Sequence, residues 1–246
     1  MFGTHDYSLS IDRQGMRIRV ERSSGVFRYI RETEGKRVEK VLSSPYARIL
    51  LHPVEPVNLP KKLTRLLEIE FDPVVMGPNS EKTFYLKFPI EIGIFLEEDG
   101  MRDVIDLVSI APPKFSLYGN PRSGVITRYF RSNTYFDIPE VEPCLEGVLK
   151  LTVKNPLREN VEVSRVVLEG HSMMLYFGRF ASMIAYLQIV NSQTGETYFM
   201  DEPLELGMER AIKLYKVRRM PVAGLERAIM IGGIEHSVFT MEWGLT

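Results

Sequence analysis

One serine lies in a context that could make it a nucleophile. Ser172 is the centre of a Gly-His-Ser-Met-Met stretch at 170–174, which follows an apolar run at 163–168. In α/β-hydrolases, a G-x-S-x-G turn between a strand and a helix exposes such a serine. Asp201 and His236 follow in the order that those enzymes use. Hydrolysis of an ester by Ser172, Asp201 and His236 is therefore one chemistry that the sequence allows.

Two features argue against this hydrolase. The tight turn needs a small residue at its last position, where this chain has Met174. The segments upstream have the pattern of hairpins, so the parallel sheet that carries a nucleophile elbow is missing. We favour a polar hairpin turn with Ser172 at its tip, and we keep the serine hydrolase as the alternative.

A short acidic segment suggests a second kind of site. Residues 97–100 read Glu-Glu-Asp-Gly, and two further aspartates follow at 103 and 106. Calcium is bound by several carboxylates from one loop, but the spacing here is not that of an EF-hand. We favour a hairpin turn with a solvated acidic face. A cation site formed by Glu98, Asp99 and Asp103 is the alternative.

Other cofactor chemistry has little support in the sequence. The four histidines are not spaced as ligands of one metal ion. Cys144 is the single cysteine, which excludes an intramolecular disulfide and a multi-cysteine zinc site. Phosphate-binding and dinucleotide-binding glycine motifs are absent from the sequence. We therefore expect neither a resident metal nor a cofactor.

A group of arginines near the N-terminus could form a partner surface. A period of two places Arg17 and Arg19 on one face of a strand, with Arg28 and Arg31 on the next strand. With neighbouring aromatics, such a sheet could bind single-stranded nucleic acid. A net charge of −1 and interleaved glutamates make nucleic acid unlikely. A solvated face or a protein-binding surface is the better interpretation.

The charges are also divided along the chain. Residues 1–65 hold 13 Lys and Arg against 7 Asp and Glu, a net charge of +6. Residues 66–110 hold 3 against 10, a net charge of −7. The two blocks could attract each other, or each could face a different partner.

The elements that position these residues are expected to be strands. Apolar and charged residues alternate along 16–20, and turn signals predict a meander of strands near 7–11, 16–22, 26–32 and 37–42. Similar alternation recurs around 69, 86 and 151. The alternation changes parity between Val163 and Val166, which predicts a bulge at 164–165 or a strand buried on both faces.

A faint repeat suggests how the strands are grouped. A strand, an Asp-Pro or Asn-Pro pair, a loop and a second strand occur around Pro73 and again around Pro156, which are 83 positions apart. We predict a mainly β protein of two tandem, immunoglobulin-like β-sandwich domains. Residues 1–121 would hold the N-terminal meander and one sandwich, and 122–246 the second. Short helices are expected near 204–214 and 222–231.

The layout resembles an uncharacterised family of archaeal proteins. The features that carry the resemblance are the N-terminal hairpins, the Phe-Ser-Leu-Tyr-Gly segment at 115–119 that leads into 124–129, and the strand pair at 151–168. The resemblance covers the whole chain. It implies an archaeal, cytoplasmic setting and supplies no activity and no site residues.

The sequence favours a non-enzymatic module that binds a protein partner or assembles with itself. No catalytic motif is complete, and β-sandwiches offer edges and loops to partners. We expect no transmembrane segment, because no apolar run is long enough to span a bilayer. The absence of a secretory signal pattern and the single cysteine indicate the cytoplasm. Three glutamines against many Arg and Glu are typical of thermophiles.

Overall fold

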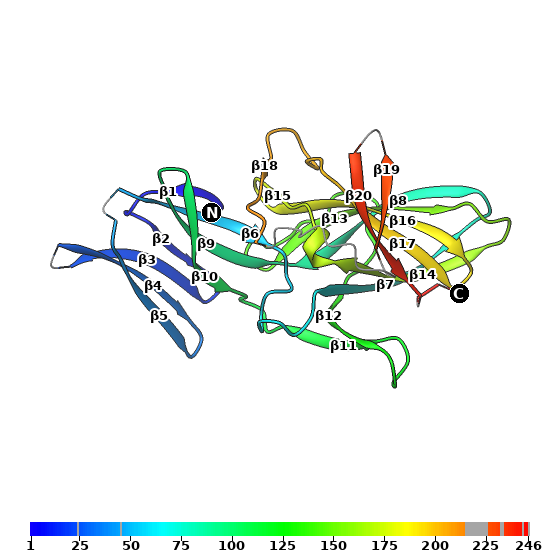
Figure 1. The fold of residues 1–246 in the computed structure, drawn as a ribbon, viewed down its shortest axis with the longest axis horizontal. Helices are drawn as coiled ribbons and strands as arrows, with labels where there is room; N and C mark the ends of the chain where they lie inside the picture. The colour runs from blue at the N-terminus through cyan, green and yellow to red at the C-terminus, as the bar shows by residue number, and fades with distance from the viewer. Residues whose placement is uncertain (24, 45, 215–225, 232–233, 243, 246) are drawn as a thin grey trace.

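The fold consists almost entirely of strands (Figure 1). The computed structural model describes the chain except residues 24, 45, 215–225, 232–233, 243 and 246. Within the described residues, the helical structure is a single 3-10 turn, Gly170–Ser172. No helix there is long and apolar enough to cross a membrane. The prediction of a mainly β protein is confirmed, while the immunoglobulin-like arrangement stays a prediction.

The predicted N-terminal meander is confirmed. Four antiparallel strands form one sheet in chain order: β2 (Ser10–Arg13), β3 (Met16–Ser23), β4 (Val26–Thr33) and β5 (Lys36–Leu42). Gln14 and Gly15 form the two-residue turn of the first hairpin, and both have positive φ. Two-residue turns of this type match the right-handed twist of the strands that they connect. One face of the sheet carries the apolar residues of the alternating pattern, including the fully buried Met16 and Ile18.

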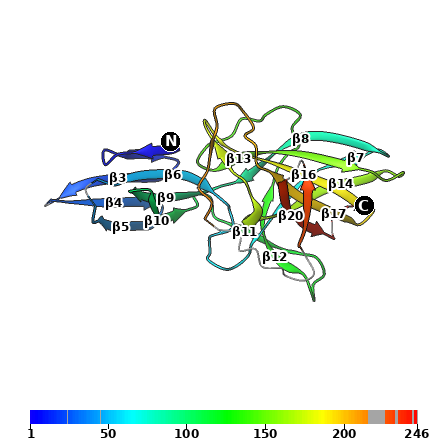
Figure 2. The same ribbon diagram turned by 45° about the horizontal axis from the view of Figure 1, so that its top comes forward.

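A second four-stranded sheet covers the inner face of the meander (Figure 2). Its strands, in spatial order, are β1 (Gly3–His5), β6 (Arg48–Val54), β9 (Glu91–Glu98) and β10 (Met101–Val108). Asp106 on β10 accepts hydrogen bonds from Arg31 Nε at 2.5 Å and from the Tyr29 hydroxyl at 3.0 Å. The two sheets make up what we call the N-terminal lobe. The buried pair between Arg31 and Asp106 is one ion pair that joins the basic and acidic blocks of the sequence.

The remaining strands form the C-terminal lobe. One sheet has the order β11 (Lys114–Tyr118), β12 (Val125–Arg131), β7 (Leu66–Met76), β14 (Val161–Glu169). The second sheet has eight strands: β8 (Ser80–Pro89), β13 (Glu146–Asn155), β15 (Tyr176–Phe177), β16 (Ala181–Asn191), β17 (Thr194–Met200), β18 (Glu209–Arg210), β19 (Glu226–Ile231) and β20 (Ile234–Met241).

The chain passes between the lobes more than once. β7 and β8 belong to the C-terminal lobe, although β6 before them and β9 after them belong to the N-terminal lobe. Strands from both sides of residue 121 share sheets, since β12 pairs with β7 and β13 pairs with β8. The division into 1–121 and 122–246 stays a prediction, and the strand pairing crosses it.

The two copies of the faint repeat build one shared core. β7 pairs with β14 and β8 pairs with β13, both antiparallel, so each strand of one unit lies beside a strand of the other. Phe71 and Phe84 pack across the two sheets with ring centroids 5.5 Å apart. Pro156 follows the last residue of β13, whereas Pro73 lies inside β7.

The predicted irregularity at 164–165 is present as a register shift between β14 and β7. The pairing of β14 with β7 shifts register between Val163 and Arg165. Val163 and Val166 are both fully buried. Residues 71–73 of β7 stand opposite residue 164 alone, so the extra residues of this irregularity are on β7 and not on β14.

The predicted short helices are wrong in the described residues. Gly207, at a φ of 86°, interrupts the segment 204–214, which contains only the two-residue strand β18. Residues 226–231 form β19, which pairs with β20 along its whole length. Pairing with a neighbouring strand outweighs the weak helical spacing there. The start of the second predicted helix, at 222–225, lies outside the described residues.

Loss of the Asp106 carboxylate is expected to destabilise the N-terminal lobe strongly. Asp106→Ala would leave the Arg31 guanidinium, only 3% exposed, without its counter-charge. We expect a loss of about 3–5 kcal/mol in the free energy of unfolding, measured by urea denaturation. The control is Asp12→Ala, which removes an exposed pair with Arg17 and should cost about 1 kcal/mol or less. Equal small losses for the two variants would contradict this role.

Candidate functional site

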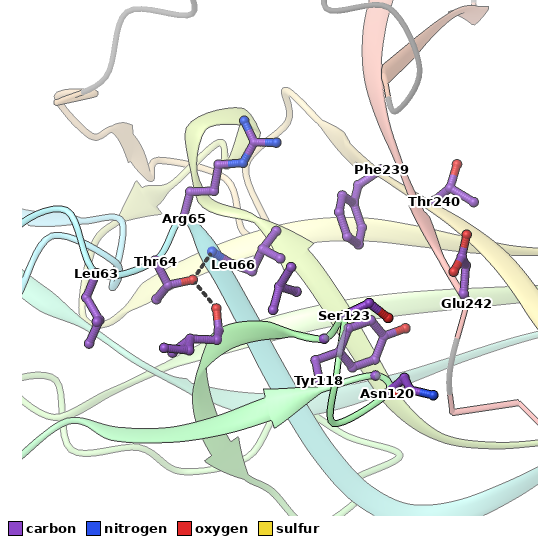
Figure 3. Close-up of a pocket in the computed structure, with 14 residues that line it drawn as sticks. Leu63, Thr64, Arg65, Leu66, Tyr118, Asn120, Ser123, Phe239, Thr240 and Glu242 are labelled. Carbon is purple, nitrogen blue, oxygen red and sulfur yellow. Dashed lines mark hydrogen bonds between the residues drawn. The ribbon is translucent and has the colours of Figure 1, made fainter.

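An apolar groove opens on the C-terminal lobe where three distant segments meet (Figure 3). The segments are the start of β7 with the loop before it, the turn between β11 and β12, and the end of β20. The volume is about 580 Å³. The lining residues are Leu63, Thr64, Arg65, Leu66, Tyr118, Gly119, Asn120, Ser123, Gly124, Val125, Ile126, Phe239, Thr240 and Glu242.

Local hydrogen bonds set the shape of this apolar groove. Thr64 Oγ1 donates to the Ile126 carbonyl at 2.6 Å and accepts from the Leu66 amide at 3.0 Å (Figure 3). These bonds hold the loop before β7 against β12. At Gly124, a Cβ atom would lie 2.7 Å from two backbone oxygens, so the turn between β11 and β12 requires glycine.

The sheet that supplies part of the lining ends at β11, which contributes Tyr118 to the groove. Within the described residues, β11 has one strand neighbour, β12, and its other side carries no strand. Leu117 on β11 lies opposite Ile126 on β12, and both side chains are about half exposed. An open edge presents unpaired backbone donors and acceptors, and exposed apolar side chains beside it mark a place where another chain can add.

Exposed basic side chains lie in the loops that line the apolar groove. Lys61, Lys62 and Arg122 are exposed in the loops that supply its lining residues. Arg65 lines the groove and pairs with the buried Glu169 at 3.5 Å. Glu242 is the carboxylate among the lining residues. Arg65 and Glu242 carry opposite charges in the lining, so the excess positive charge of these loops comes from Lys61, Lys62 and Arg122, and it favours an acidic ligand.

A buried ion pair joins the two lobes behind the groove. Arg128 Nη1 on β12 donates to Glu91 Oε1 on β9 at 2.8 Å, and both side chains are buried. The amides of Asn58 and Leu59 also donate to the Glu91 carboxylate. Burial raises the pKa of Glu91 and lowers that of Arg128, while their mutual attraction opposes both shifts.

A second polar contact between the lobes involves two titratable residues. The segment 211–214, which follows β18, crosses to the N-terminal lobe. The Ile212 amide donates to His52 Nδ1 at 3.1 Å, and the Leu214 amide donates to Glu55 Oε2 at 3.5 Å. Burial raises the pKa of Glu55 to about 7 and lowers that of His52 to about 4. His52 is thus neutral at physiological pH, as an acceptor must be.

The comparison with protein families gives one match. A family model described as a protein of unknown function (DUF432) matches residues 1–236. The chain belongs to this family. No curated protein and no solved structure matches the chain. The predicted membership of an uncharacterised family is confirmed, and it brings no activity with it.

No described contact joins Ser172, Asp201 and His236, the three residues of the hydrolase alternative. Ser172 ends the 3-10 turn after β14, which pairs antiparallel with β7. Asp201 accepts a hydrogen bond from the Tyr176 hydroxyl and pairs with Arg210, each at 2.9 Å. His236 lies on β20, and its side chain is outside the described residues. The triad stays a prediction without a supporting contact.

The acidic segment forms the turn between β9 and β10, as the favoured interpretation expected. Glu98 accepts a hydrogen bond from Ser44 Oγ at 2.5 Å, and Asp99 and Gly100 form the turn at positive φ. Among the described residues, no group of three or more His, Cys, Asp or Glu side chains could hold a metal ion. The structure therefore adds no support to a cation site at Glu98, Asp99 and Asp103.

Three of the four N-terminal arginines lie on the outer face of the meander, and the fourth does not. Arg31 is buried against Asp106, so its assignment to a partner surface is wrong. Register alternation is the reason, since Arg31 faces the opposite side from its neighbours on β4. The other three are paired with carboxylates: Arg17 with Asp12 and Glu32, Arg19 with Glu21 and Glu32, and Arg28 with Glu39. This network of paired charges offers little net attraction to nucleic acid.

The sequence did not reveal the groove. Its lining comes from three segments that are more than 50 residues apart in the chain. The Tyr-Gly-Asn-Pro turn at 118–121 was the one signal in these segments, and turn chemistry alone does not show what lies beside it.

The two titratable residues at the junction are expected to have opposite effects on stability. Glu55 keeps its proton up to a pH of about 7 when folded, against an ordinary pKa of 4.5, so its contribution falls as pH rises through this window. His52 has an ordinary pKa of 6.5 and a folded value of about 4, so its contribution rises over a similar window. Their effects nearly cancel in the unaltered protein.

In the Glu55→Gln variant, the contribution of His52 to the pH dependence of stability is no longer cancelled by that of Glu55. We expect the free energy of unfolding of this variant to gain about 3 kcal/mol relative to the unaltered protein as pH rises from 4.5 to 7. Urea denaturation at several pH values measures the difference. Glu34→Gln, in an exposed turn, serves as the control and should leave the pH profile unchanged. A constant difference between Glu55→Gln and the unaltered protein would show that Glu55 titrates normally.

Proposed function

We propose that this protein is a non-enzymatic binding module that holds an extended segment of a partner protein in the apolar groove. The observation that carries the proposal is an apolar groove partly lined by Tyr118 of β11, a strand that has a neighbour on only one side in the described residues. A segment added along an edge strand gains main-chain hydrogen bonds, and every second side chain points to the same side. The groove can receive those side chains.

The lining supports a peptide ligand with apolar anchors. Tyr118, Leu66 and Phe239 come from three different strands and offer aromatic and aliphatic surface (Figure 3). Thr64, Asn120 and Ser123 add polar groups around this surface. Protein interfaces usually have an apolar centre that is surrounded by polar groups.

The rim supports an acidic segment. Lys61, Lys62 and Arg122 would attract carboxylates that flank the apolar anchors. Charges at the rim of an interface act mainly on association rate and partner choice. The proposed ligand is therefore an extended segment in which apolar and acidic residues alternate.

We also propose that the protein works in the cytoplasm of a thermophilic archaeon. Burial raises the pKa of the Cys144 thiol to about 11, which makes it a passive group that needs no oxidising compartment. The connected ion pairs on the outer face of the meander are of the kind that stabilises proteins at high temperature.

Selection from a displayed library of random nine-residue peptides tests the binding proposal. The library is first depleted on a Val125→Glu/Ile126→Glu variant and then selected on the unaltered protein. We expect sequences that alternate apolar and acidic residues, and we expect their synthetic peptides to slow amide exchange along β11. Affinity for the variant should be at least about tenfold weaker, because both substitutions place charge in the apolar lining.

The matched control is Val75→Glu. Val75 is also an exposed valine on a strand, and it does not line the groove. The selected peptides should bind this control as tightly as the unaltered protein. Peptides that bind all three proteins equally, or a selection that yields no enriched sequence, would overturn the proposed function.

A further inference from the structure

The N-terminal lobe carries a feature with the chemistry that the apolar groove requires. We propose that the segment received by the groove is the turn between β9 and β10 of a second copy of this chain, together with the start of β10, an extended strand at the edge of its sheet in the described residues. The inference rests on the proposed function, since it names the partner of that same site. We call this turn the acidic tip and define it by Tyr46, Glu98, Asp99, Met101 and Asp103.

The strand register places an apolar side chain between carboxylates at the acidic tip. Met101 lies opposite Glu98, and Asp103 lies two residues further along β10, so the three share one face of the hairpin. Met101 is 72% exposed, so its side chain is accessible to another chain. An exposed methionine flanked by acidic groups is suited to an apolar groove with a basic rim.

Tyr46 adds a second exposed anchor beside the hairpin. Its side chain is 88% exposed and, with Glu97 and Gly100, lines one shallow hollow. The Tyr46 amide donates to Ser44 Oγ at 3.2 Å, and Ser44 Oγ donates to Glu98, so this segment is fixed to the tip. Aromatic residues and methionine are enriched where proteins meet.

The charges nearby leave the tip acidic. Glu97, on the opposite face of the hairpin, is paired with Arg102 at 2.7 Å. Glu98, Asp99 and Asp103 form no ion pair among the described residues. The exposed Arg48 lines the same hollow, so the tip carries one arginine and an excess of carboxylates. Lys61, Lys62 and Arg122 are exposed in the loops that line the groove.

The positions of the two surfaces determine what kind of assembly results. The acidic tip belongs to the N-terminal lobe and the groove to the C-terminal lobe (Figure 1). When the tip of one copy occupies the groove of the next, the first copy keeps a free groove and the second keeps a free tip. Such a contact is heterologous and adds copies head to tail.

Sedimentation velocity with charge-reversed variants tests this inference. The unaltered protein should associate as its concentration rises, and salt should weaken the association because the rim charges are exposed. A tip variant, Glu98→Lys/Asp103→Lys, and a rim variant, Lys61→Glu/Lys62→Glu, should each stay monomeric alone. An equimolar mixture of the two should associate, because each then offers the other a surface of opposite charge.

The apolar anchor has its own variant and control. Met101→Ala should weaken self-association by at least about tenfold if the side chain enters the groove. Val104→Ala removes a half-exposed apolar side chain from the same strand outside the tip and should leave the association unchanged. Because all of these positions are exposed, the variants are expected to fold as the unaltered protein does.

The outcomes separate this inference from the proposed function. A protein that stays monomeric at every concentration, or whose association is unaffected by the tip and rim variants, overturns the inference. If selected peptides still bind the groove in that case, the proposed function stands with a different protein as partner. If neither the peptides nor a second copy bind, both are wrong.

Discussion

The ion pair between Glu91 and Arg128 is the interaction on which the arrangement of the molecule depends. Both groups are buried, and the pair joins β9 of the N-terminal lobe to β12 of the C-terminal lobe. Glu91 begins the strand that ends at the acidic tip, while Arg128 lies two residues after Ile126 in the apolar groove. Removing either partner would leave a buried charge uncompensated, so the pair holds the lobes in one relation. The two surfaces are therefore presented at fixed positions.

Much of the fold could be predicted from local pattern. Alternation around Met16 and Ile18, with Gln14-Gly15 as a turn, was enough to predict the meander, because hairpins depend on neighbouring residues. The change in parity between Val163 and Val166 likewise predicted the irregularity at 164–165. Pairing between distant strands could not be predicted in this way. The parallel contact of β12 with β7 and the crossing of β7 and β8 into the C-terminal lobe leave no local signal.

The candidate site was harder to predict for the same reason. Arg31 is three residues after Arg28, so a period of two places these two arginines on opposite faces, but the sequence does not show that Asp106 lies on the buried side. The groove residues Leu66, Tyr118 and Phe239 are far apart in the sequence and follow no regular spacing, so no local pattern predicts that they meet. The sequence predicts that the acidic segment at 97–100 is a turn. It does not show that Met101 is exposed beside this turn, or that a groove lies on the other lobe. The acidic block has residues in two kinds of position. Asp106 pairs with the buried Arg31 inside the N-terminal lobe, and Glu98 is exposed at the acidic tip.

Hydrogen–deuterium exchange of the unaltered protein at low and high concentration tests the central claim most directly. The claim is that the groove beside β11 and the acidic tip occupy each other between copies. We predict that amides at 114–118 and at 98–103 become protected together as concentration rises, while those of β5 do not change. Exchange that is independent of concentration in both segments, or protection of one segment without the other, would contradict the account.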